Sequence, residues 1–401
     1  MSIGTVPNPK MRILTGGLRP LRSRERTGYL PTLDGWRAVA ILGVIFCHDS
    51  LHSFGPASTG WLYAHGGNGV DLFFAISGLL ICWRLLEEEQ VFGGISLRNF
   101  YIRRAFRILP PALSCLAVIG ILTMTGVLQI GFREFLGSVF FFRNYTSLLG
   151  RIGPDSYFTG HFWSLAVEEH FYLILPAVLV LARRRWRAPI LIGMAFLIEL
   201  HRFQLMGSTP WDFVQFHTGI RLDGLLIPAA LAVLVQSSRI RENLRKGLRF
   251  WPLFLVADIL LVSNWEGRFW EGTVVALLLP MTVLGSVLNP NDYLAMVLEW
   301  TPIRYIGRIS YSLYLWQQLF FAGHFHGFLY PLGILERTPL RYFATLAIAV
   351  ASYHLLERPL IRLGHRLAPP ATPGREDVSM NGLSGVVPHK AGVPESETHL
   401  P

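Results

Sequence analysis

Charged residues are scarce in this sequence. Asp, Glu, Lys and Arg make up 15% of its 401 residues, whereas soluble domains carry roughly 25%. Hydrophobic residues reach 51%, and stretches such as 111–130 and 272–288 contain no charge at all. A soluble protein would have to hide too many such segments in one core. The composition therefore indicates an integral membrane protein.

Cysteine is also rare, which bears on redox chemistry and metal binding. The three cysteines, Cys47, Cys82 and Cys115, all fall within apolar stretches, so no disulfide framework is implied. We expect no metal site.

The basic N-terminal stretch leads into Leu33-Asp34-Gly35 without a small-residue cleavage site, and we expect no cleavable signal.

The long apolar segments are the main feature that is present. A helix needs about 20 apolar residues to cross the hydrocarbon core of a membrane. The sequence predicts an all-α, polytopic membrane helix bundle of about ten transmembrane helices. The predicted spans are 36–54, 69–86, 111–130, 163–182, 189–206, 218–236, 250–264, 272–288, 305–323 and 340–357.

The net charge of +10 comes from arginine-rich connections rather than from a nucleic-acid-binding surface. Basic residues gather before the first span and in every second connection, at 10–26, 98–107, 183–187 and 239–249. This is the positive-inside pattern. It predicts that both termini are cytoplasmic and argues against a nucleic-acid partner.

The same pattern gives a domain plan. We expect a basic cytoplasmic N-terminal arm over 1–32, a transmembrane domain over 33–366 and a disordered cytoplasmic tail over 367–401. The tail is rich in Pro, Gly, Ser and Glu, a composition that cannot bury enough apolar surface to fold.

Ionisable side chains inside the predicted spans are candidates for function, because each is costly in a bilayer. Arg37 lies at the start of the first span, and His48 lies eleven residues later, about 16 Å along a helix. Asp71 begins the second span, followed by a Ser77-Gly78 pair that suits close helix packing. Glu168 lies one turn or more inside the fourth span. Each of these ionisable residues could instead have a structural role, either in a hydrogen bond between helices or as a charge in the first turn of a helix.

Two arginines open the third span. Arg104 and Arg107 are spaced i, i+3, so on a helix they project together and offer guanidinium groups suited to phosphates. The alternative is that they only set the membrane topology.

These blocks together resemble the acyltransferase-3 family, the multi-span membrane O-acyltransferases of bacteria. The blocks that carry the resemblance are LDGWRAVAILGVIFCH (33–48), GVDLFFAISGLLI (69–81), RRAFRILPP (103–111), HFWSLAVEEHFYLILP (161–176), RLDGLL (221–226), IGRISYSLYLW (306–316) and LLERPL (355–360). In that family, His48 would be essential for transfer and Arg104 with Arg107 would handle the acyl-CoA. Two residues depart from the family's usual pattern: His170 replaces Gln, and Gln317 replaces His.

The resemblance implies an enzyme of the bacterial inner membrane that moves an acyl group, by default acetyl from acetyl-CoA, onto a hydroxylated acceptor such as a saccharide. We expect Arg37, Arg104 and Arg107 to bind the acyl-CoA. His48 would act either as general base or as a transient acyl carrier, oriented by Glu168 or Asp71. The alternative function is a proton-coupled transporter or a lipid-linked glycan flippase, because intramembrane His, Asp and Glu also suit proton relays.

Overall fold

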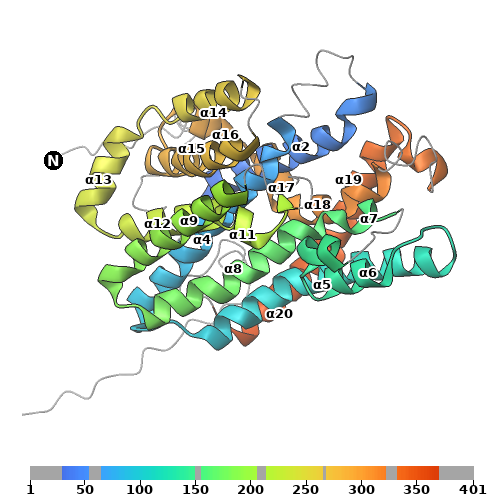
Figure 1. Cartoon of the computed structure of the whole chain (residues 1–401), viewed down its shortest axis with the longest axis horizontal. Coiled ribbons are helices and arrows are strands. Elements are labelled where there is room, and N and C mark those ends of the chain that lie inside the picture. Colours follow the sequence, from blue (N-terminus) through green and yellow to red (C-terminus); the bar gives the residue numbers. More distant parts are fainter. Residues whose placement is uncertain are drawn as a thin grey trace, which may run out of the picture. The chain divides into compact units, whose positions relative to one another are not determined.

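The computed structural model describes residues 29–53, 65–149, 155–205, 214–264, 268–321 and 332–369. These ranges are helical and contain no strand. The helices, shown in Figure 1, are α2 (Pro31–Ser53), α4 (Asn68–Phe92), α5 (Leu97–Met124), α6 (Phe132–Val139), α7 (Tyr157–Gly160), α8 (Phe162–Leu181), α9 (Arg184–Leu205), α11 (Thr218–Arg221), α12 (Asp223–Leu234), α13 (Ser238–Gly247), α14 (Pro252–Asn264), α15 (Arg268–Leu288), α16 (Tyr293–Leu298), α17 (Thr301–Arg308), α18 (Ser310–Phe320), α19 (Leu340–Ser352) and α20 (Arg358–Leu367). Three short non-α turns are η1 (Arg143–Leu149), η2 (Gly333–Glu336) and η3 (Tyr353–Glu357).

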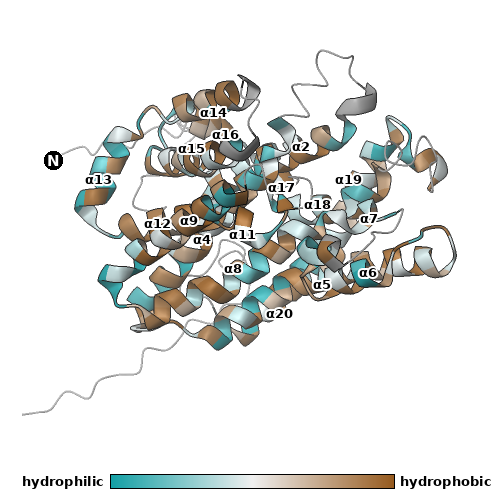
Figure 2. Cartoon of the chain, in the orientation of Figure 1, coloured by the Kyte–Doolittle hydropathy of each residue, from teal (hydrophilic) through white to brown (hydrophobic). Residues whose placement is uncertain are grey.

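The helices bear out the all-α membrane prediction. Five are long and apolar enough to cross a membrane, by length and composition: Asn68–Phe92, Leu97–Met124, Tyr157–Leu181, Arg184–Leu205 and Glu271–Leu288. A helix overlaps each of the other predicted spans, but the total of about ten crossings stays a prediction. Figure 2 shows hydrophobic residues along α4, α5, α8, α12 and α15. Large apolar side chains such as Leu173 and Phe196 are more than 60% exposed, as expected where lipid replaces water.

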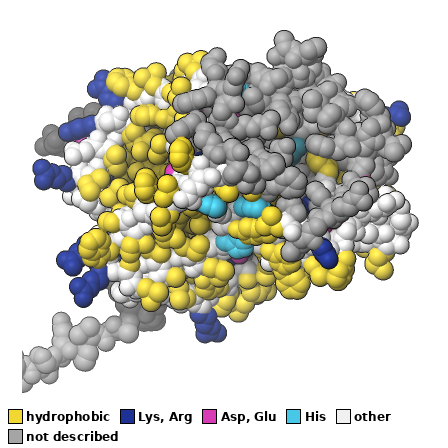
Figure 3. Space-filling model, in the orientation of Figure 1, with side chains coloured by type: hydrophobic (Ala, Val, Ile, Leu, Met, Phe, Trp, Pro, Cys, Tyr) yellow, Lys and Arg dark blue, Asp and Glu magenta, His cyan; other side chains and the backbone are white. Residues whose placement is uncertain are grey.

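Arginine-rich connections meet at one end of the bundle. Arg187 at the start of α9 donates to Glu89 near the end of α4 (2.7 Å), and Gln90 donates to Gln236 after α12 (2.6 Å). The basic helix α13 follows directly. Figure 3 shows Lys and Arg side chains at that end and a broad hydrophobic face beside them. The clustering agrees with the positive-inside pattern, although the side on which the termini lie stays a prediction.

Glycines allow the central helices to approach closely. A Cβ on Gly78 of α4 would overlap the carbonyl oxygen of Leu225 on α12. The expectation that the Ser77-Gly78 pair permits close helix packing is thus confirmed. This contact fixes α4 against α12 and places Ser77 at the candidate site.

The contact between α2 and α17 depends on a second glycine, and it supports the helix that carries Arg37 and His48. A Cβ on Gly307 would overlap the carbonyl oxygen of Asp34. We therefore expect Gly307→Ala to destabilise the protein by several kcal/mol, because backbone must move to admit the methyl group. Thermal unfolding in detergent measures the effect. Gly193→Ala in α9 is the matched control, since its Cβ would meet nothing within 4 Å and alanine favours a helix interior; an equal loss of stability in both variants would contradict the expectation.

Candidate active site

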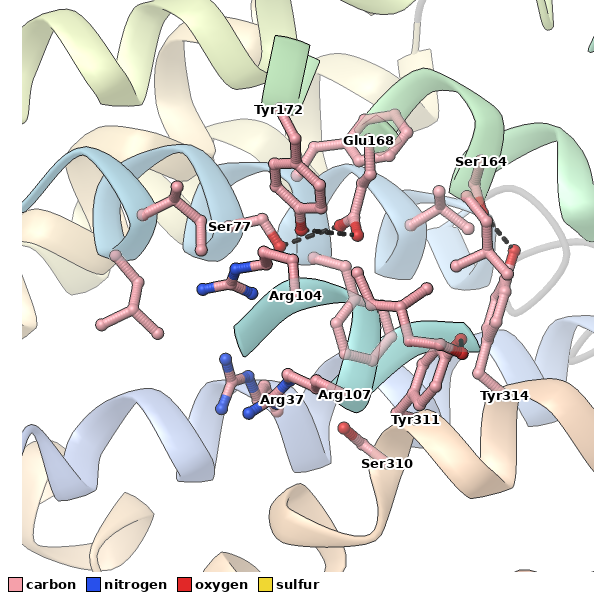
Figure 4. Close-up of a pocket in the computed structure, with 17 residues that line it drawn as sticks. Arg37, Ser77, Arg104, Arg107, Ser164, Glu168, Tyr172, Ser310, Tyr311 and Tyr314 are labelled. Carbon is pink, nitrogen blue, oxygen red and sulfur yellow. Dashed lines mark hydrogen bonds between the residues drawn. The ribbon is translucent and has the colours of Figure 1, made fainter. Parts of the chain in front are cut away.

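A cavity of about 720 Å³, including its open mouth, lies among α2, α4, α5, α8 and α18. Figure 4 shows the residues that line it. Three arginines occupy one end, and a serine and a tyrosine occupy the other. The polar lining residues are Arg37, Ser77, Arg104, Arg107, Ser164, Glu168, Tyr172, Ser310, Tyr311 and Tyr314. The sequence thus brings polar groups from five helices to one internal site.

The arginine end of the cavity carries positive charge that is little neutralised. Arg104 and Arg107 project together from α5, as their spacing predicts. Within the described ranges neither forms an ion pair, and Arg37 has only Asp34 at 3.4 Å. The guanidinium of Arg104 lies over the ring of Tyr172, 5.3 Å from its centre. Such a cluster suits a phosphate-bearing ligand, because guanidinium forks bind phosphate oxygens with charge-assisted hydrogen bonds.

Glu168 lies inside the cavity and is held by two hydroxyl groups. Ser77 donates to one carboxylate oxygen (2.8 Å) and Tyr172 to the other (3.1 Å). Ser164, Glu168 and Tyr172 are each four residues apart on α8, so they share one face of that helix. Tyr172 was missed in the sequence, although its i, i+4 spacing from Glu168 was a usable signal.

His48 on α2 is not among the residues that line the cavity. Its Nδ1 donates to Oε1 of Gln317 on α18 at 2.9 Å, and its ring lies edge-on to Tyr157 with the centroids 5.9 Å apart. The hydrogen-bond partner of this imidazole nitrogen is thus a neutral amide, whereas Glu168 and Asp71 are bound to other residues. The sequence feature that could have pointed to Gln317 is its position directly after the YLW block, where this chain has Gln and the family usually has His.

A hydrogen-bonded layer of side chains lies at the inner end of the cavity. Ser164 and Tyr314 are hydrogen-bonded at 2.7 Å, and the Tyr314 hydroxyl also donates to the carbonyl oxygen of His161 (3.0 Å). His161 is itself held by Gln318, the residue after Gln317. Two adjacent glutamines of α18 thus hold the imidazoles of His48 and His161, one turn beyond Tyr314.

Asp71 belongs to a different cluster. It accepts a hydrogen bond from Arg221 at 2.6 Å, and nearby Arg202 pairs with Asp223 at 2.7 Å. Four of the six predicted site residues therefore line one cavity, and His48 and Asp71 lie outside it. In the described ranges, no group of His, Cys, Asp and Glu side chains could hold a metal ion.

The pairing of Asp71 with Arg221 predicts an effect on stability rather than on chemistry. Asp71→Ala should cost about 3–5 kcal/mol, because it leaves the charge of Arg221 without its partner. The double variant Asp71→Leu/Arg221→Met should recover most of that stability and retain transfer activity. Unfolding and activity measured on both variants check this expectation. A stable but inactive double variant would instead give Asp71 a role in the reaction.

These features define a multi-pass helical membrane protein with an internal cationic cavity. A family model described as an acyltransferase domain matches residues 30–355. The chain belongs to this acyltransferase-3 family, and this part of it is an acyltransferase domain.

Named relatives agree with the family. The chain is 29% identical over 374 residues to a candidate O-acetyltransferase of Staphylococcus aureus (strain COL), covering 85% of this chain and 58% of the relative. It is 28% identical to a candidate peptidoglycan O-acetyltransferase of Bacillus subtilis (strain 168), over 84% of this chain and 56% of the relative. It is 26% identical to the O-acetyltransferase OatA of S. aureus (strain NCTC 8325 / PS 47), over 84% of this chain and 58% of the relative. The chain thus spans less than three fifths of the length of these relatives. No solved structure was found to match it.

Proposed function

We propose that the protein is an integral membrane O-acyltransferase that moves an acyl group, acetyl by default, from acyl-CoA to a hydroxyl of a saccharide-type acceptor. The observation that carries the proposal is the cavity that runs from three arginines to the Ser164–Tyr314 layer, together with His48, which is held by Gln317 one turn further along α18. The arginines supply a site for phosphate groups and His48 supplies a basic nitrogen, the two elements that transfer from acyl-CoA requires.

The donor fits the arginine end of the cavity. The phosphates of CoA cannot enter hydrocarbon, so Arg104, Arg107 and Arg37 hold them at the mouth. The pantetheine arm extends into the cavity, where its amide N–H groups face the Glu168 carboxylate. Arg37 and His48 lie eleven residues apart on α2, a rise of about 16 Å, which sets the length that the arm has to cover.

The reaction takes place at His48. Its Nδ1 proton is held by Gln317, so Nε2 carries the lone pair. Nε2 removes the proton of the acceptor hydroxyl, the oxygen attacks the thioester carbonyl, and the C–S bond breaks. The proton then passes to the leaving thiolate, which gives CoA and an O-acyl ester. In a second route, Nε2 attacks the thioester first and carries the acyl group to the acceptor. Both routes require the Ser164–Tyr314 layer to open.

The protein crosses the bacterial inner membrane about ten times, with both termini in the cytoplasm. The acceptor is a hydroxylated saccharide presented at the outer side of that membrane. The name of the B. subtilis relative includes peptidoglycan, and a peptidoglycan-type sugar is the first acceptor to test. His48 lies toward the end of α2 that is remote from the arginines, which supports an approach of acceptor and donor from opposite sides.

Mass analysis of cell-surface saccharides tests this function in cells. We expect an acyl ester, 42 Da for acetyl, on saccharides from cells that carry the protein, and none from cells that lack it or carry His48→Ala. Unchanged ester content in all three, with altered amounts of surface saccharide, would favour a flippase.

A further inference from the structure

Gln317 has a buried hydrogen-bond donor that nothing in the described structure satisfies. Its side chain is fully buried, and its Oε1 accepts the Nδ1 proton of His48. Its Nε2 forms no hydrogen bond within the described ranges. Buried polar groups are nearly always paired, so an unpaired amide group in a native structure calls for an explanation.

The position of Gln317 connects the cavity with His48. Ser310 and Tyr314 line the cavity from α18, and Gln317 follows them at i+7 and i+3. The three residues therefore share one face of that helix. Gln317 lies one turn beyond the cavity-lining Tyr314 on that face, and its side chain contacts the imidazole of His48.

Covalent geometry limits the distance between the free donor and the imidazole of His48. The oxygen and nitrogen of one amide are separated by about 2.3 Å, and the oxygen lies 2.9 Å from Nδ1 of His48. The amide nitrogen is therefore within about 5 Å of the imidazole. A carbonyl group that lies beside His48 is within reach of its N–H groups.

We propose that Gln317 is a catalytic residue whose amide N–H group donates to the acyl carbonyl oxygen while its own oxygen fixes the tautomer of His48. The inference rests on the proposed function. As the acceptor oxygen adds to the thioester, negative charge develops on the carbonyl oxygen, and a donor already in place stabilises that charge without reorganisation. Leu313 and Phe320, four residues before Gln317 and three after it on α18, are also buried, and such apolar surroundings strengthen the interaction.

The next residue offers a matched comparison. Gln318 also holds a histidine, since its Oε1 accepts from Nδ1 and from the backbone N–H of His161. Its amide group therefore lies beside His161 rather than beside His48. Gln317→Met and Gln318→Met each remove a buried glutamine that holds a histidine ring, and Gln318→Met also removes a bond to the backbone N–H of His161; only Gln317→Met removes a free donor beside His48.

The test compares these variants in the full-length protein, with acetyl-CoA as donor and a peptidoglycan-type saccharide as acceptor. We expect Gln317→Met to lower kcat by about 10²–10³-fold, as for the loss of one oxyanion donor, with the KM for acetyl-CoA unchanged. Gln318→Met should lower kcat far less. Gln317→His restores an N–H donor and should recover kcat to within about tenfold of wild type.

Two outcomes would overturn the inference. One is an equal fall in kcat in Gln317→Met and Gln318→Met, which would make Gln317 a structural residue. The other is a kcat of Gln317→Met close to wild type while His48→Ala is inactive, which would leave the proposed function in place. An active His48→Ala protein would refute the proposed function itself. Thermal unfolding of each variant in detergent separates lost folding from lost catalysis.

Discussion

Replacing His48 by alanine is expected to lower kcat by about 10²–10⁴-fold, the usual contribution of a positioned general base. The imidazole is held by Gln317 on α18, one turn beyond Tyr314 at the inner end of the cavity, and this neutral amide fixes its tautomer. Loss of the ring removes the atom that takes the acceptor proton. If His48 instead carries the acyl group, the loss is at least as large, because a covalent intermediate can no longer form.

The His48 variant should still bind the donor. Arg104 and Arg107 lie at the far end of the cavity, so the affinity for acetyl-CoA, measured by calorimetry in detergent, should be unchanged. His354→Ala is the control, since that histidine is exposed and contacts Tyr305 away from the cavity. Near wild-type kcat in His48→Ala would remove the residue from the mechanism.

The second large effect is expected for the arginine pair. Arg104→Ala/Arg107→Ala should raise the KM for acetyl-CoA by about 10²-fold or more, because hydrogen bonds to charged groups contribute about 1.5–3 kcal/mol each. The effect should depend on the phosphates of the donor. Wild-type protein should prefer acetyl-CoA to acetyl-pantetheine, which lacks the nucleotide, and the double variant should lose that preference.

A topological role for these arginines predicts a different result. Arg183→Ala/Arg185→Ala removes two arginines that are exposed in the described structure from another basic connection, so its influence on membrane orientation should be similar. We expect its KM to stay at the wild-type value. Equal changes in the two double variants would show that Arg104 and Arg107 act through topology alone.

Local spacing was enough to predict much of the fold and part of the site. The positions of the helices follow from apolar segments, and the pairing of Arg104 with Arg107 follows from the helical period, which the cavity confirms. The same period placed Ser164 and Glu168 on one face. Each of these features lies on a single helix, where sequence separation fixes geometry.

Contacts between distant helices could not be predicted in this way. Gln317 meets His48 across 269 residues, and Arg221 meets Asp71 across 150. Both pairings depend on how α18 and α11 pack against α2 and α4. The sequence had placed carboxylates beside the imidazole because an acidic partner is the commoner choice for a catalytic histidine. Packing at Gly78 instead directs Ser77 to Glu168, which leaves the carboxylate in the cavity.

The most direct test follows both products of the reaction in purified protein. Proteoliposomes receive acetyl-CoA labelled in the acetyl group and a peptidoglycan-type saccharide on the opposite side, and free CoA thiol and labelled ester are measured over time. The proposed function predicts equal amounts of thiol and saccharide ester, formed only with acceptor present and lost in His48→Ala. Labelled thioester that stays intact while saccharide crosses the membrane would contradict it.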